Sequence, residues 1–185
     1  MRQEKKVLAC VDKSDYAVHV ADYAAWAAAR LSAPIELLHV IDRHPEIAAD
    51  VDRSGSIGVD AQENLLERLS QEEGERSKVM REQGRVFLNQ LRTRCETHAG
   101  LQTDTRQRYG QLLATLKEQE SSVGMYVLGR RGESASHTRR DLGRHVEVIC
   151  RQIRRPIMTV TDDFKAPKSV LVAYDGGRMT RRGIE

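Results

Sequence analysis

The fold is decided by residues 6–41, KVLACVDKSDYAVHVADYAAWAAARLSAPIELLHVI. The apolar run Lys6–Val11 predicts a buried strand, and the alanine-rich stretch Asp15–Arg30 predicts a helix with Ser14 as its N-cap. Pro34 follows that helix, and Ile35–Ile41 predicts a second buried strand. A strand, a helix and a strand joined by short connections are typical of a parallel sheet with right-handed crossovers. We therefore expect an open α/β fold.

The later residues continue this alternation. The leucine pattern predicts a helix over Ala61–Leu69, and a longer helix is expected from about Glu75 to Thr97, with Gly84 as its weak point. Leu101–Arg108 alternates polar residues with threonine, as an exposed or edge strand does. The remaining expected elements are a helix over Gly110–Glu120, a buried strand over Gly124–Leu128, a helix from about Arg144 to Arg154 and a strand over Ile157–Val160.

A repeat begins near the end of the printed sequence. Thr161–Ser169 has the composition of a linker, and Val170–Asp175 (VLVAYD) then restates Val7–Asp12 (VLACVD). Each copy ends at an aspartate that precedes a helix-start pattern. This repeat predicts tandem domains rather than a solenoid. We expect one domain over residues 1–162, and over residues 163–185 a linker with the first strand of an incomplete second domain.

The composition excludes several classes of protein. Hydrophobic residues make up 39% of the chain and charged residues 31%, and no apolar stretch approaches the roughly 20 residues of a membrane span. Cys10, Cys95 and Cys150 form no CxxC pair, which indicates reduced thiols and a cytoplasmic protein. The basic excess is modest and no aromatic stacking motif is present, so a nucleic-acid partner is not expected.

Signatures of common enzyme classes are also missing from the sequence. It contains no GxxxxGK[ST] loop, no GxGxxG after the first strand and no GxSxG elbow. His39 lies within an apolar strand, which favours a core histidine over a catalytic one. No base, nucleophile or metal cage is recognisable, so the sequence favours binding over catalysis.

A glycine-containing stretch follows the strand Gly124–Leu128. Gly129, Gly132 and Gly143 precede a helix start, where free N–H groups and the helix dipole favour a phosphate. The alternative is that these glycines serve tight turns only. Arg144 occupies the helix start and could contact a polyphosphate, and His145 in the first turn could do the same. Asp12, at the end of the first strand, is either a ligand contact or a turn residue.

The ordered set KVLACVDKSDYAVHVADYAAWAA, PIELLHVID, YVLGRRGESASHTRRDLG and RRPIMTV resembles the universal stress proteins, in particular the bacterial tandem type. The stretch SGSIGVDAQENLLERL is similar to a helical insertion of that group. The resemblance implies a Rossmann-like, five-stranded parallel sheet of order 3-2-1-4-5 with helices on both faces.

The resemblance also implies a nucleotide site. Asp12 and the adjoining backbone of Val11 would meet adenine and ribose, and Val40 would contact the base. The phosphates would lie on the glycine motif that follows Leu128, namely Gly129, Gly132 and Gly143. Two departures stand out: ten residues rather than nine separate Gly132 from Gly143, and Arg144 replaces a serine or threonine.

We therefore expect a cytosolic stress-response protein that binds ATP, with or without Mg²⁺, or a related adenine nucleotide, as a sensor or regulatory module. The alternative is a nucleotide-free dimerisation or scaffold module, and slow ATP hydrolysis or autophosphorylation stays open. Ile157–Val160 would form an apolar edge strand, which readily pairs with another chain. We expect a two-fold homodimer in which two copies of this strand pair antiparallel.

Overall fold

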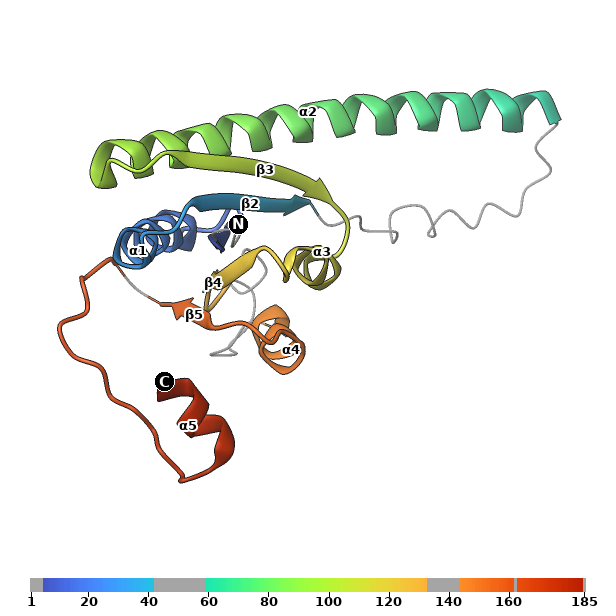
Figure 1. Ribbon diagram of the computed structural model, residues 1–185. Coiled ribbons are helices and arrows are strands. Elements are labelled where there is room, and N and C mark those ends of the chain that lie inside the picture. Colours follow the sequence, from blue (N-terminus) through green and yellow to red (C-terminus); the bar gives the residue numbers. More distant parts are fainter. Residues whose placement is uncertain (1–4, 42–58, 133–143, 162, 185) are drawn as a thin grey trace.

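A computed structural model describes residues 5–41, 59–132, 144–161 and 163–184. It contains a five-stranded sheet of order β3-β2-β1-β4-β5 in which every neighbouring pair is parallel. The predicted fold class and strand order are confirmed (Figure 1). The elements are β1 Lys6–Cys10, α1 Tyr16–Leu31, β2 Ile35–Ile41, α2 Val59–Ala99, β3 Thr103–Tyr109, α3 Leu112–Gln119, β4 Val123–Gly129, α4 Arg144–Gln152, β5 Ile157–Val160 and α5 Arg178–Ile184.

Helices cover both faces of the sheet. On one face, α1 and α2 pack against side chains that include Val7, Ala9 and Leu37. Apart from Val20, the buried side chains of α1 are alanines, and Ala21, Ala24 and Ala28 are fully buried. Because alanine is short, the backbone of α1 can lie close to the strands.

The opposite face is covered by α3 and α4. Leu116 of α3 and Ile149 of α4 pack against Leu8, Leu38 and Tyr126 of the three central strands. Tyr126 is fully buried, and its hydroxyl donates a hydrogen bond to the Leu116 carbonyl at 2.8 Å. The buried phenol is therefore satisfied, and it ties α3 to β4.

A charged cluster lies on this second face. The Glu36 side chain on β2 is 6% exposed, and Lys6 Nζ on β1 lies 2.9 Å from its Oε2. The same ammonium donates to Gln119 Oε1 at 2.9 Å, and the Arg106 guanidinium approaches Glu36 Oε2 at 3.4 Å. The buried carboxylate is thus held by two cations from the neighbouring strands β1 and β3.

The expectation of two helices between β2 and β3 is wrong. One helix, α2, runs from Val59 to Ala99 without a break at Gly84. A Cβ on Gly84 would lie 2.4 Å from Gln107 Nε2 on β3, so the missing side chain makes room for this strand. The Tyr109 hydroxyl donates to the Ser77 carbonyl at 3.2 Å, and α2 continues well past the end of β3 (Figure 1).

The predicted cap of the first helix is also wrong. Asp15 occupies the N-cap position of α1 and makes no side-chain capping bond. Ser14 instead donates its backbone N–H to Asp12 Oδ1 at 3.1 Å, and its hydroxyl donates to the same oxygen. The aspartate therefore organises the turn between β1 and α1.

The repeat stretch Val170–Tyr174 does not form a strand in this chain. Val170 is 84% exposed and Leu171 is 99% exposed, and a short helix, α5, follows from Arg178. The matching stretch β1 already lies between β2 and β4, so the sheet offers the second copy no central position. Within the described ranges, no helix is both long enough and apolar enough to cross a membrane.

Candidate functional site

The two halves of the sheet diverge between β1 and β4. The chain leaves β1 through α1 toward β2, whereas it reaches β4 through α3 on the opposite face. In open α/β sheets, ligands bind outside the carboxyl ends of strands at such a switch point. Cys10 at the end of β1 is in register with Leu128 of β4. Val11 and Asp12 therefore follow at the same edge, beside Gly129 and Arg130.

Asp12 and Gly132 meet directly at this edge. Asp12 Oδ1 is held by Ser14, and a Cβ on Gly132 would lie only 2.7 Å from Asp12 Oδ2. No side chain fits at residue 132 unless the carboxylate moves. Asp12 and Gly132 are far apart in the sequence, and the sequence analysis predicted both for one site. The fold brings them together.

Gly129 is required by the course of the loop that follows β4. A Cβ at this position would lie 2.9 Å from the Arg131 carbonyl oxygen and 3.5 Å from Tyr16 Cβ. The next residue, Arg130, donates its backbone N–H to the Val160 carbonyl at 2.7 Å. The loop is therefore fixed against the first turn of α1 and the last residue of β5.

The backbone of Val11 is fixed by β2. Its N–H donates to the Leu38 carbonyl at 2.9 Å, and its carbonyl accepts a hydrogen bond from His39 Nδ1, also at 2.9 Å. His39 is buried and its ring lies edge-on to that of Phe87. The interpretation of His39 as a core histidine is confirmed, and its hydrogen bond positions the residue before Asp12.

Val40 lies farther along the same edge. It is half-buried on the α3 side of the sheet and is in register with Arg108 of β3, which is exposed. Sequence reasoning missed Arg108, although residues 104, 106 and 108 alternate toward one face of an edge strand. Val40 and Arg108 form the end of the carboxyl edge away from Gly132.

Sequence reasoning also missed Tyr16, the first residue of α1, which lies against Gly129. Its signal in the sequence is the spacing of Tyr16, His19 and Tyr23, which places the three side chains on one stripe of a helix.

Three predicted residues follow the loop. Gly143 lies outside the described residues, and Arg144 begins α4, but its side chain is not among those described. His145, in the first turn of α4, is exposed. The phosphate-binding role of these three residues stays a prediction.

The two thiols near the sheet, Cys10 and Cys95, both have raised pKa values. Burial raises the pKa of Cys10 far above its ordinary value, and the nearby Glu36 carboxylate adds to the effect. Burial likewise raises the pKa of Cys95 to about 11. Both thiols stay protonated at neutral pH. Within the described part of the chain, no group of three or more His, Cys, Asp or Glu side chains could hold a metal ion.

Comparison with known proteins identifies the family of the chain. The model of the universal stress protein family matches residues 4–161. The universal stress protein Slr1230 of Synechocystis is 33% identical over 183 residues, which are 98% of this chain and 63% of that relative. The chain thus spans less than two thirds of the length of this curated relative.

Solved structures share the fold. The universal stress protein UspA of Lactobacillus plantarum superposes with a TM-score of 0.53 at 20% identity, over 86% of this chain and 99% of that one. The hypothetical protein MJ0577 gives a TM-score of 0.60 at 18% identity, over 88% and 99%. A universal stress protein in complex with cAMP gives 0.52 at 14% identity, over 86% and 98%. At these identities the likeness is one of fold.

Proposed function

The chain belongs to the universal stress protein family, and we propose that it binds ATP or a related adenine nucleotide as a sensor in the stress response. Binding would stabilise one conformation or assembly over another through differential affinity, without turnover of the nucleotide. The nucleotide would lie across the carboxyl ends of β1, β2 and β4.

The observation that carries this proposal is the close approach of Asp12 to Gly132. A carboxylate at the end of β1 can accept hydrogen bonds from ribose hydroxyls, and a loop without side chains lets phosphate oxygens approach backbone N–H groups. Both features occur at the switch point of the sheet, where a Cβ on Gly132 would lie 2.7 Å from Asp12 Oδ2. The cAMP complex of a protein with this fold supports the choice of an adenine nucleotide.

The charges near the loop agree with an anionic ligand. Arg130 and Arg131 follow Gly129 directly and are half-buried, and Arg144 begins α4. We propose that Arg144 replaces the hydroxyl donor of the family pattern with a charged contact to the distal phosphates. Mg²⁺ would arrive with the nucleotide and be held mainly by its phosphates, since Mg²⁺ needs few carboxylates in such sites.

A thermal-shift series tests the binding. ATP, ADP, AMP and cAMP are added to the full chain, and the nucleotide that binds is expected to stabilise it by about 2.7 kcal/mol at a hundred times its dissociation constant. Nucleotide retained through purification would be identified by mass spectrometry. The absence of any shift, together with a preparation free of nucleotide, would favour the scaffold alternative. A phosphate-release assay is expected to show no turnover.

The scaffold alternative has its own structural support in β5. This strand pairs with β4 on one side, through bonds such as Tyr126 N–H to the Pro156 carbonyl. Residues alternate along a strand, so the N–H groups of Ile157 and Thr159 point away from β4. We propose that this outer edge pairs antiparallel with the same edge of a second copy in a two-fold dimer.

The dimer is tested by Ile157→Pro, which removes an outward donor without touching the ladder to β4. Light scattering at micromolar concentration is expected to give a dimer for the unchanged chain and a monomer for this variant. Met158→Lys, which brings a charge to the strand, is expected to act in the same direction. Circular dichroism would check that both variants keep their fold. A monomeric unchanged chain would refute this interface.

We also propose that residues 163–185 are a linker and the start of a second copy of the domain, in which Val170–Tyr174, not a strand in this structure, corresponds to the first strand. The turn after each strand stretch supports this. Gly177 donates its N–H to Asp175 Oδ1 at 2.7 Å, as Ser14 does to Asp12 Oδ1 at 3.1 Å. In both places a helix begins within a few residues, so the repeat extends from sequence to local structure.

A further inference from the structure

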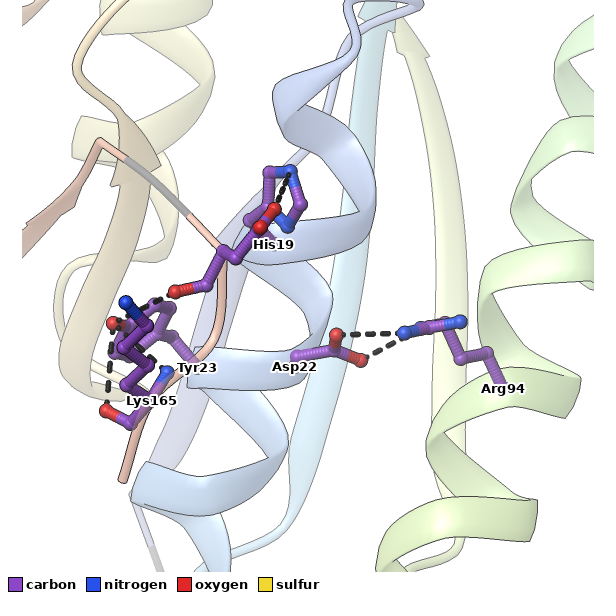
Figure 2. A network of polar contacts seen from close by, with 6 residues as sticks. His19, Asp22, Tyr23, Arg94 and Lys165 are labelled. Carbon is purple, nitrogen blue, oxygen red and sulfur yellow. Dashed lines mark hydrogen bonds and ion pairs between the residues drawn. The ribbon is translucent and has the colours of Figure 1, made fainter. Parts of the chain in front are cut away.

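One stripe of α1 contacts both the candidate nucleotide loop and the segment that follows β5. Tyr16, His19 and Tyr23 are spaced three and four residues apart, so their side chains lie along one side of the helix. Tyr16 lies against Gly129 in the loop. The other two contact the chain after β5, whereas Asp22 points to the opposite side and binds Arg94 of α2 (Figure 2).

The contacts of His19 and Tyr23 with Asp163, Phe164 and Lys165 are called the clasp below. His19 Nε2 lies 3.3 Å from Asp163 Oδ1. The rings of Tyr23 and Phe164 meet edge to face with centroids 4.9 Å apart, and Lys165 donates its backbone N–H to the Tyr23 hydroxyl at 3.3 Å. The clasp therefore fixes the direction in which the chain leaves the domain.

The clasp is built from individually weak contacts. The Asp163 side chain is 84% exposed, and ion pairs between exposed groups contribute little to stability. The Tyr23 hydroxyl lies at 3.5 Å from both the Asp163 and the Lys165 carbonyl oxygens, which is long for a hydrogen bond. Because no single contact is strong, a small change at either end of the stripe alters how often the clasp opens.

The Gly129–Gly132 loop is connected to the clasp through β5 as well as through Tyr16 of α1. Arg130, between Gly129 and Gly132, donates its N–H to the Val160 carbonyl at 2.7 Å. Val160 ends β5, three residues before Asp163. A hollow beside the clasp is lined by Asp15, Tyr16, His19, Thr161 and Asp163. The loop thus contacts α1, which carries one side of the clasp, and β5, which leads into the other side.

We propose that a nucleotide on the Gly129–Gly132 loop closes the clasp, so that binding at this site controls release of the segment after β5. This inference rests on the proposed function. An ordered loop holds Tyr16 and Val160 in place, and the stripe of α1 then presents His19 and Tyr23 to Asp163–Lys165. Linkage makes the effect reciprocal: whatever factor the nucleotide adds to the closing of the clasp, the clasp adds to nucleotide affinity.

Hydrogen exchange of the full chain tests whether nucleotide binding closes the clasp. The Lys165 amide donates to Tyr23, so its exchange reports directly on the clasp. Saturating ATP is expected to slow exchange of residues 163–168 by roughly five-fold, at the low end of measured couplings between sites.

The reciprocal effect of the clasp on nucleotide affinity is tested with the variant Phe164→Ala. Phe164 belongs to the clasp and lies outside the core of the sheet. This variant is expected to lose the protection by ATP and to bind ATP more weakly by the same factor. Arg94→Ala is the matched control, because it breaks the ion pair on the other side of α1 and is expected to leave protection and affinity unchanged.

The outcomes separate the two proposals. If ATP binds but residues 163–168 exchange at the same rate, or Phe164→Ala binds ATP like the unchanged chain, the clasp is not coupled to the site and only this inference fails. If the unchanged chain responds to no adenine nucleotide, the proposed function fails and the inference fails with it.

Discussion

Gly132→Val is expected to abolish nucleotide binding, with a loss of at least roughly 100-fold in affinity, equivalent to about 2.7 kcal/mol. A Cβ at this position would lie 2.7 Å from Asp12 Oδ2, so even alanine displaces the carboxylate. The two methyl groups of valine would also occupy space that the phosphates need. Isothermal titration calorimetry with the nucleotide identified by thermal shift would measure the loss.

Gly74→Ala is the matched control for this prediction. Gly74 lies within α2, and a Cβ there would have no heavy atom within 4 Å. Alanine is the better helix former, so this variant is expected to keep full affinity and unfold at an equal or slightly higher temperature. Gly132→Val that binds as tightly as the control would place the nucleotide elsewhere. Gly129 is less suitable for such a test, since its Cβ would also contact the core residue Val20 at 3.6 Å.

The sequence predicted the fold because its signals are local. A buried parallel strand appears as a continuous apolar run, and most strand boundaries were predicted to within two residues. The single helix α2 was predicted as two, because the leucine pattern of Ala61–Leu69 does not continue to Glu75. Gly84, the expected weak point of the second helix, lies opposite Gln107 of β3, a neighbour that the local sequence does not reveal. Likewise, Val170–Tyr174 has the composition of a strand, but composition does not say whether a stretch pairs, and in this structure these residues form no strand.

The site was partly predictable for a related reason. The carboxyl ends of parallel strands share one edge, so Asp12 and Gly129 had to lie near each other once the strand order 3-2-1-4-5 was assumed. The contact between Asp12 and Gly132 depends on how the loop folds back, and the clasp depends on the path of the chain after β5. Neither path follows from periodicity, because the contacts join residues far apart in the sequence.

The second large effect is expected at Glu36, where Glu36→Ala should destabilise the domain by about 3 kcal/mol. The substitution leaves Lys6, whose side chain is 16% exposed, without its carboxylate. It also deprives Arg106 of its partner at 3.4 Å. This value is at the lower end of the stability losses seen when a buried ion pair is broken, because Arg106 is 42% exposed and can turn toward water. Urea denaturation followed by circular dichroism would measure the change in the free energy of unfolding.

Two variants separate the loss of a buried charge from the loss of side-chain volume. Glu82→Ala removes an exposed carboxylate that pairs with Arg85 at 2.6 Å, and it is expected to leave the free energy of unfolding nearly unchanged. The double variant Lys6→Met, Glu36→Leu removes both charges and keeps apolar volume, so it is expected to recover most of the stability lost in Glu36→Ala. If Glu36→Ala were as mild as Glu82→Ala, the Lys6 ammonium would have to reach solvent freely, and the cluster would contribute little to the sheet. If the double variant stayed as unstable as the single one, lost packing rather than an unpaired ammonium would explain the effect.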